Sequence, residues 1–153
     1  MRLFPYAPIL LAVRHPCDVV LSCYMQHFRA PDFALLCNDL PTLAQGYRRA
    51  FDFWYEQVRI LKPRYLEVRY ETLVADFSAQ MQRAVDFLGL PWRDEVLVPA
   101  SGAHRKRFIS TPSYAQVTQP VTTASVGRWK PYARYFAPLL GVLAPYLERW
   151  SYD

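Results

Sequence analysis

Short apolar runs and helical periodicities alternate in the first part of the chain. Residues 7–13 form an apolar run that ends at Arg14, as expected for a buried strand of a parallel sheet. Pro16 follows at a position that the first turn of a helix accepts. From residue 17 to residue 28, apolar side chains recur at about 100° per residue and predict a helix with one apolar stripe. The polar side of that helix is predicted to hold Asp18, Ser22 and Met25.

The pattern continues with a loop, a long helix, a strand and a shorter helix. Residues 31–38 are predicted to form the loop. Beyond Pro41, apolar residues spaced by three and four predict a helix that ends before Pro63. Alternation over residues 65–70 predicts a strand, and a stripe over residues 76–88 predicts the last of these helices. This order of strands and helices predicts an α/β fold with a parallel sheet and flanking helices.

The last third of the chain is less regular. Residues 110–125 are rich in Ser, Thr, Pro and Gln and predict a loop. Helical patterns return over residues 129–150, between prolines. No stretch has the composition of a linker, so we expect a single domain over residues 1–153.

Composition narrows the class of protein. Hydrophobic residues make up 52% of the chain and charged residues 20%, which is enough apolar material for a packed core. Three cysteines are too few for a disulfide framework and indicate a reducing compartment, so a cytoplasmic location is expected. The uncharged residues 135–147 are too short to span a bilayer, and the first residues lack the pattern of a signal peptide.

An excess of arginine adds a hint of function. The net charge is +5, and fifteen of the 18 basic residues are Arg, whose planar fork suits phosphate and sulfate oxygens. An enzyme with an anionic substrate fits, and so do a nucleic-acid binder and a GC-rich genome that favours arginine codons. The arginines are scattered along the sequence, which counts against nucleic acid.

Candidate chemistry concentrates in residues 14–22 (Arg-His-Pro-Cys-Asp-Val-Val-Leu-Ser). Arg14 ends a predicted strand, and ligands of open α/β sheets gather at the carboxyl ends of strands. A helix begins directly afterwards, and the free N–H groups at a helix start attract anions. Arg14 and Ser22 could therefore meet on one phosphate. From the residues alone, a surface arginine and an exposed helical serine are the simpler interpretation.

The segment from Arg14 to Ser22 resembles the 3′-phosphate-binding segment of sulfotransferases that use 3′-phosphoadenosine 5′-phosphosulfate (PAPS). In that family an Arg at a strand end is followed by a Ser at this same spacing. The most similar branch is the bacterial group often fused to tetratricopeptide repeats and related to tyrosylprotein sulfotransferases. The resemblance implies that Arg14 and Ser22 bind the 3′-phosphate of the nucleotide.

Three later segments resemble the same family in the same order. Residues 69–73 (Arg-Tyr-Glu-Thr-Leu) resemble a strand-end motif whose Tyr contacts adenine, and residues 87–92 resemble the helix end that follows. Residues 111–129 resemble the segment that closes over the nucleotide. The resemblance implies a site for PAPS, or for its product 3′-phosphoadenosine 5′-phosphate (PAP), with no metal and with no residue of this chain assigned to catalysis. The implied nucleotide-binding residues are Arg14, Ser22, Tyr70, Ser113 and Arg128.

Two parts of the family pattern are missing from the sequence. In the family a loop rich in Gly and Ser/Thr holds the 5′-phosphosulfate on the model of a P-loop, and the five glycines here form no such cluster. The family's general base also lies upstream of the segment that Arg14 matches. The resemblance therefore implies a P-loop-nucleotide-hydrolase-like parallel sheet with flanking helices, whose N-terminal P-loop strand is missing. We expect the C-terminal portion of a sulfotransferase domain, inactive by itself, with an open sheet edge that favours pairing with another chain, such as a homo-oligomer.

The expected partners are a nucleotide cosubstrate and a hydroxyl acceptor of unknown class, with no nucleic acid and no membrane. The alternative function is a non-enzymatic module that binds the nucleotide or packs against a partner. No spacing of Cys or His matches a metal site, so no metal is expected. His27 lies on the predicted apolar stripe and is expected to be a core histidine.

Overall fold

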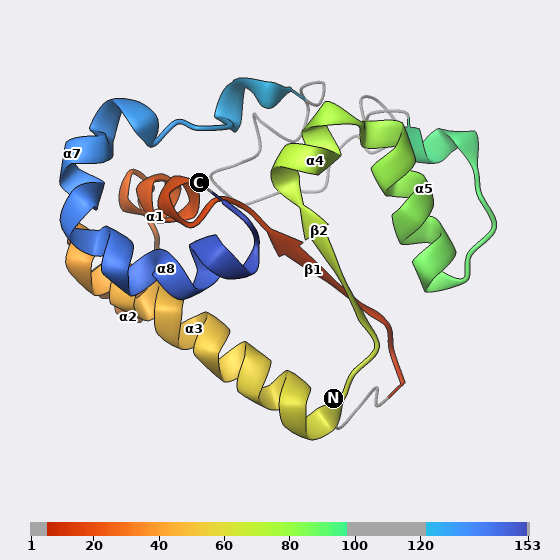
Figure 1. The fold of residues 1–153 in the computed structure, drawn as a ribbon, viewed down its shortest axis with the longest axis horizontal. Coiled ribbons are helices and arrows are strands. Elements are labelled where there is room, and N and C mark those ends of the chain that lie inside the picture. Colours follow the sequence, from red (N-terminus) through yellow and green to blue (C-terminus); the bar gives the residue numbers. More distant parts are fainter. Residues whose placement is uncertain (1–5, 98–121, 153) are drawn as a thin grey trace. The chain divides into compact units, whose positions relative to one another are not determined.

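The computed structural model describes residues 6–97 and 122–152. Strand, helices, strand and further helices follow one another along the chain (Figure 1). None of the helices in these described ranges combines the length and apolarity needed to cross a bilayer. The elements are β1 (Ile9–Val13), α1 (Pro16–Tyr24), α2 (Pro31–Leu36), α3 (Leu40–Leu61), β2 (Tyr65–Arg69), α4 (Tyr70–Ala75), α5 (Phe77–Leu88), η1 (Asp94–Leu97), η2 (Thr123–Ser125), η3 (Lys130–Tyr132), α7 (Ala133–Phe136), η4 (Ala137–Leu139) and α8 (Leu140–Arg149).

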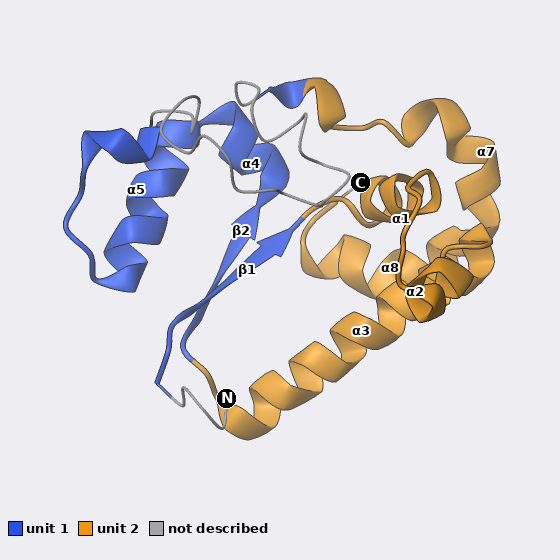
Figure 2. Ribbon diagram, turned by 180° about the vertical axis from the view of Figure 1, so that it is seen from behind, with its two compact units in different colours: residues 1–13, 64–123 blue, residues 14–63, 124–153 orange. Residues whose placement is uncertain are grey.

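The elements group into two compact units (Figure 2). Unit 1 comprises residues 1–13 and 64–123, and unit 2 comprises residues 14–63 and 124–153. Each unit is therefore assembled from two stretches that are distant in sequence. The expected single domain over residues 1–153 stays a prediction.

Unit 1 is built on two parallel strands. β1 pairs with β2, and Val13 stands opposite Arg69 at their carboxyl ends. This pairing confirms the predicted parallel sheet, which has two strands within the part of the chain that the structure describes. The predicted burial of the first strand is wrong for Leu10, which is 42% exposed. Exposure alternates along β1, because a strand is buried throughout only where other layers cover both of its faces.

Two helices follow β2, of which α4 was not predicted and α5 was. The predicted strand over residues 65–70 ends one residue early, because Tyr70 already begins the short helix α4. Asp76 then caps α5 by accepting a hydrogen bond from Ala79 N (3.1 Å). Gly89 ends α5 in a left-handed conformation with φ +70°, which suits a residue without a Cβ atom. The predicted helix up to residue 88 is confirmed.

Unit 2 is a group of helices packed around α3, which contacts α1, α2 and α8 (Figure 1). Asp39 accepts a hydrogen bond from Thr42 N (2.7 Å) at the start of α3, and Lys62 ends it in a left-handed conformation before Pro63. The predicted long helix is confirmed. The buried apolar side chains described in this unit are Cys17, Val20, Leu21, Cys37, Leu43, Ala44, Tyr47, Phe136, Leu139, Leu143, Tyr146 and Trp150.

The loop predicted over residues 31–38 is wrong, because residues 31–36 form α2. Leu36 packs directly on α3 at Gly46, where an added Cβ atom would lie only 2.6 Å from Leu36 Cδ1. The glycine therefore lets the two helices approach, and this contact is not visible in the local pattern. The predicted core position of His27 is also wrong. α1 ends at Tyr24, so His27 lies beyond the helix and is exposed.

Polar and aromatic contacts join α3 to the C-terminal helix α8. Tyr146 donates a hydrogen bond from its hydroxyl to Asp52 Oδ1 (2.6 Å), and Trp150 Nε1 donates to the hydroxyl of Tyr55 (3.1 Å). The Arg149 guanidinium carbon lies 3.6 Å from the centroid of the Tyr55 ring. The helical pattern predicted over residues 129–150 is thus confirmed in α7 and α8, with a proline inside α8.

Candidate functional site

Arg14, the first residue after β1, is oriented by two contacts inside unit 2. Its Nη2 donates a hydrogen bond to the carbonyl oxygen of Ser125 and lies 3.6 Å from Oδ2 of Asp18. Its side chain keeps 19% of its surface exposed. Hydrogen bonds and ion pairs that involve a charged group are stronger than neutral contacts. The guanidinium is therefore held in a defined direction, while part of the side chain reaches the surface.

Asp18 is a buried carboxylate with 1% of its surface exposed. Its Oδ2 accepts a hydrogen bond from Gly127 N (2.7 Å), and its Oδ1 accepts one from Trp129 N (2.9 Å). These amides and the nearby Arg14 guanidinium offset the cost of burying a charge. The sequence predicts Asp18 on the side of its helix away from the apolar stripe. Asp18 is nevertheless buried, because the C-terminal segment supplies hydrogen-bond donors to it.

Arg128 lies between the two amides that Asp18 binds. The backbone on both sides of Arg128 is therefore tied to α1, whereas Arg128 itself is exposed. Gly127 has φ +70°, a conformation that L side chains rarely adopt. Two of the predicted nucleotide-binding residues, Arg14 and Arg128, are thus linked through one carboxylate.

His15 caps α1. Its Nδ1 accepts a hydrogen bond from Cys17 N (3.2 Å), so one of the helix-start amides expected to attract an anion has a partner inside the chain. The ring of His15 stacks on Trp129, with centroids 5.0 Å apart. Ser22 lies further along α1 and is exposed, which fits the predicted polar side of the helix. Ser22, the side chain of α1 that is expected to contact the phosphate, therefore lies at the surface.

Tyr70 belongs to unit 1. It directly follows Arg69, whose strand partner is Val13, the residue before Arg14. The Tyr70 hydroxyl donates a hydrogen bond to the carbonyl oxygen of Thr122 (3.3 Å). Ser113 lies outside the described residues. The nucleotide-binding roles of all five residues stay predictions.

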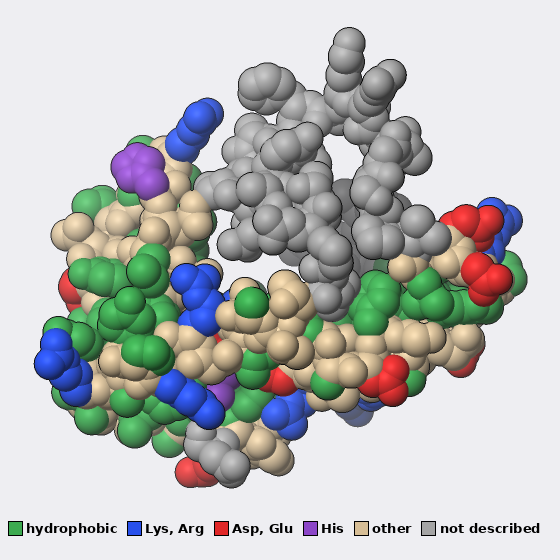
Figure 3. All heavy atoms as spheres, turned by 90° about the horizontal axis from the view of Figure 1, so that it is seen from above, with side chains coloured by type: hydrophobic (Ala, Val, Ile, Leu, Met, Phe, Trp, Pro, Cys, Tyr) green, Lys and Arg blue, Asp and Glu red, His purple; other side chains and the backbone are tan. Residues whose placement is uncertain are grey.

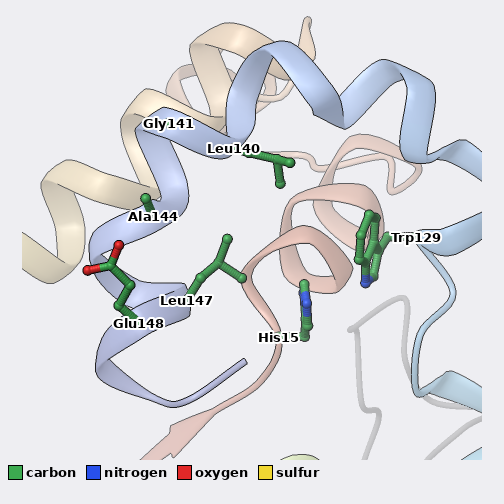
Figure 4. A pocket seen from close by; sticks show the side chains of 7 residues that line it. All are labelled: His15, Trp129, Leu140, Gly141, Ala144, Leu147 and Glu148. Carbon is green, nitrogen blue, oxygen red and sulfur yellow. The ribbon is translucent and has the colours of Figure 1, made fainter. Parts of the chain in front are cut away.

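A hollow of about 380 Å³ opens in unit 2 between the start of α1 and α8 (Figure 4). In Figure 4, Leu140 and Leu147 project from α8 toward the side on which His15 and Trp129 lie. A phosphate needs several N–H or O–H donors, and this lining is mainly apolar. None of the predicted nucleotide-binding residues lines it, so it is distinct from the predicted site. Its lining residues are His15, Trp129, Leu140, Gly141, Ala144, Leu147 and Glu148.

The described residues hold no metal-binding cluster, and the face drawn in Figure 3 shows no single basic patch. Across residues 6–97 and 122–152, no group of three or more His, Cys, Asp or Glu could hold a metal ion. On the face drawn in Figure 3, Lys and Arg side chains lie apart, with apolar and uncharged groups between them. This dispersion gives no support to the nucleic-acid alternative, which requires basic side chains gathered on one surface.

Comparison with known proteins assigns the family. A family model described as "Sulfotransferase family" matches residues 1–94, which is more than half of the chain. The chain belongs to the sulfotransferase family. The matched residues of this sulfotransferase chain include Arg14, Ser22 and Tyr70.

Relatives of this sulfotransferase chain include protein-tyrosine sulfotransferases, which confirms the resemblance found in the sequence. The chain is 30% identical to the protein-tyrosine sulfotransferase of Drosophila melanogaster over 140 residues, which cover 84% of the chain and 26% of that relative. It is 29% identical to protein-tyrosine sulfotransferase A of Caenorhabditis elegans over 162 residues (99% and 40%). It is 30% identical to protein-tyrosine sulfotransferase 2 of Gallus gallus over 165 residues (99% and 42%). The chain thus spans less than half the length of each of these relatives.

Asp18 is a residue of this candidate site whose contacts sequence reasoning missed. Its partners Gly127 and Trp129 lie 109 and 111 residues away along the chain. A local signal existed, because Asp18 stands four residues after Arg14 and in the first turn of a helix. That signal points to a pair with Arg14, but it does not distinguish a surface pair from a buried one.

Burial of Cys17 predicts a loss of stability in alkali. The side chain is fully buried next to Asp18, and both effects raise the pKa of the thiol from its ordinary 9.0 to about 12. Above pH 9 the unfolded chain releases this proton and the folded chain keeps it. The free energy of unfolding should therefore fall by about 1.4 kcal/mol per pH unit near pH 10 through this group, and not at pH 7.

Denaturant titrations at several pH values between 7 and 10.5 measure this slope. Cys17→Ser removes the titrating thiol, so its slope near pH 10 should be shallower by that amount even if its stability at pH 7 is lower. Cys37→Ser gives a comparison at a second buried cysteine. Burial also raises the pKa of that thiol, so its removal should make the slope shallower as well. Equal slopes for the native chain and Cys17→Ser would contradict the prediction.

Proposed function

We propose that this chain forms the 3′-phosphate and adenine side of a PAPS-binding site in a sulfotransferase that transfers a sulfuryl group to a hydroxyl acceptor. Arg14, Ser22 and Arg128 would bind the 3′-phosphate side, and Tyr70 and Ser113 would contact the rest of the nucleotide. PAPS supplies the activated sulfuryl group when it is bound. The residues of this chain bind and orient the nucleotide and do not move protons in the reaction.

The observation that carries the proposal is the sulfotransferase family match over residues 1–94. The chemistry of the matched residues fits the ligand, because two guanidinium groups and a hydroxyl are donors that suit phosphate oxygens. The direction in which Arg14 is held supports the same function. Its guanidinium is anchored on one side by Ser125 and Asp18, as expected for a group that positions an anion.

The side of the site that binds the phosphosulfate needs a glycine-rich loop, and the five glycines of the sequence form no such cluster. A dense set of backbone amides is required around the 5′-phosphosulfate, and a base is required near the acceptor hydroxyl. We therefore propose that β1 and β2 belong to a larger P-loop-type parallel sheet and that the 153-residue chain alone does not transfer sulfate. The names of the relatives make a protein tyrosine the first acceptor to test.

Calorimetric titration of the 153-residue chain with PAP and with 5′-AMP tests the nucleotide assignment. A charged contact to the 3′-phosphate contributes about 1.5–3 kcal/mol, so PAP should bind about tenfold or more tightly than 5′-AMP. Equal affinities for the two nucleotides, or no binding of PAP, would refute the assignment.

A transfer assay separates the sulfotransferase fragment from an enzyme that is complete in itself. The chain is incubated with labelled PAPS and a tyrosine-containing peptide. PAP binding without transfer is the expected result. Transfer that survives purification and disappears in Arg14→Ala would show that these residues also supply the phosphosulfate side and the base. Continued inactivity of a longer protein that adds a glycine-rich loop would favour a non-enzymatic nucleotide-binding module.

A further inference from the structure

We propose that Asp18 is a positioning residue for nucleotide binding, and this inference rests on the proposed function. Asp18 touches no part of the expected ligand. It joins the Arg14 guanidinium to residues 125–129, so that Arg14 and Arg128 present their charges to the nucleotide in a fixed arrangement.

The geometry places Asp18 at the centre of three separate contacts. Each of its carboxylate oxygens accepts one hydrogen bond from a backbone amide, one from Gly127 N (2.7 Å) and the other from Trp129 N (2.9 Å). Its Oδ2 also lies 3.6 Å from Nη2 of Arg14. The same Nη2 donates to the carbonyl oxygen of Ser125, so the segment is attached to Arg14 directly as well as through Asp18.

Burial makes this arrangement rigid. A carboxylate with 1% exposure has no water to replace a lost partner, so each of its hydrogen bonds holds more firmly than a similar bond at the surface. The stacking of Trp129 on His15 adds a second attachment of the segment to α1. The backbone at Arg128 therefore cannot move without breaking the hydrogen bond from Gly127 N or from Trp129 N to Asp18.

The charge of Asp18 matters as well as its shape. It offsets part of the positive charge of Arg14. Removing the negative charge of Asp18 would by itself strengthen the attraction for an anion, so a loss of preference for the 3′-phosphate in Asp18→Asn reports lost positioning. The exposed Arg128 then supplies positive charge beside the pair. Recognition of a 3′-phosphate should accordingly depend on both arginines, and the contribution of Arg128 should depend on Asp18.

The test compares Asp18→Asn with the native chain in titrations with PAP and 5′-AMP. Asn keeps the size of the side chain but loses the charge and cannot accept both amides. Asp18→Asn should reduce the preference for PAP over 5′-AMP by about tenfold and leave 5′-AMP affinity nearly unchanged. The matched control is Asp52→Asn, which makes the same change at an exposed carboxylate of α3 and should keep the full preference.

A double-mutant cycle separates positioning from simple weakening of the fold. If Asp18 acts by placing Arg128, then Asp18→Asn should have a much smaller effect on PAP binding in a chain that already carries Arg128→Ala. Additive losses in the double variant would overturn the proposal. An unchanged PAP preference in folded Asp18→Asn would overturn it as well.

A measurement on the native chain covers the case in which Asp18→Asn does not fold. In amide-proton NMR, the Gly127 and Trp129 signals should be protected from exchange, and PAP should shift them more than 5′-AMP does. Rapid exchange of both amides, or equal shifts with both nucleotides, would overturn the proposal. If the native chain shows no preference for PAP at all, the proposed function fails first. If that preference is present and only the Asp18 predictions fail, the proposed function stands without this inference.

Discussion

Replacing Phe136 by alanine is expected to lower the free energy of unfolding by about 3–5 kcal/mol. Phe136 ends α7 with 0% of its surface exposed, and its ring packs edge-on against Trp129 with centroids 6.0 Å apart. Deleting the ring removes apolar contacts and leaves a cavity. The neighbouring Leu139 and Leu143 are themselves buried in short helices, so they cannot move far enough to fill it. Urea denaturation followed by circular dichroism measures the loss.

Phe53→Ala is the matched control for this prediction. It deletes the same ring in the same unit, but Phe53 is 64% exposed on α3. Its substitution should change the free energy of unfolding by no more than about 0.5 kcal/mol. Comparable losses in Phe53→Ala and Phe136→Ala would show that the core of unit 2 is not where the structure has it.

Arg14→Ala is expected to weaken PAP binding by about tenfold or more and to leave 5′-AMP binding nearly unchanged. The reason is that 5′-AMP lacks the phosphate that Arg14 is proposed to bind. The variant also leaves Asp18 buried without its cationic neighbour, so its melting temperature should fall. Calorimetry with both nucleotides, at a temperature at which the variant is folded, measures the preference.

Arg48→Ala controls for the loss of one positive charge. Arg48 lies on α3, where its Nε is 3.5 Å from Oδ2 of Asp52, and it has no part in the proposed site. This variant should keep the native preference for PAP. If Arg14→Ala weakens PAP and 5′-AMP equally, the 3′-phosphate assignment is wrong, and Arg14 serves only to hold the fold.

Elements with strong local signals could be predicted from the sequence. α3 carries its apolar residues at helical spacing, a capping Asp39 at its start and Lys62-Pro63 at its end, so its bounds follow from neighbouring residues. α2 could not be predicted in this way. It is short, and it is stabilised where Leu36 meets Gly46, a contact between two helices that no local periodicity records.

The same distinction applies to the candidate site. Arg14 and Ser22 are recognisable because a strand end and a helix start are local features with a known spacing. The role of Asp18 could not be predicted, because its two amide donors come from the other end of the chain. The helical period predicts Asp18 away from the stripe of Val20, but it carries no information about the segment that buries Asp18.

The division of unit 2 into two stretches has a consequence during synthesis on the ribosome. Residues 14–63 emerge first, and residues 124–153 follow only after the sixty residues between them. Until Gly127 and Trp129 arrive, the Asp18 carboxylate must remain hydrated and the faces of α1 and α3 that later contact α8 are uncovered. The hydrogen bond from Trp129 N to Asp18 joins residues that are 111 positions apart. Closing so long a loop has an entropic cost that the formation of a local helix does not have. Unit 2 therefore completes its folding late, and a nascent chain that stalls before residue 124 exposes apolar surface to chaperones and proteases.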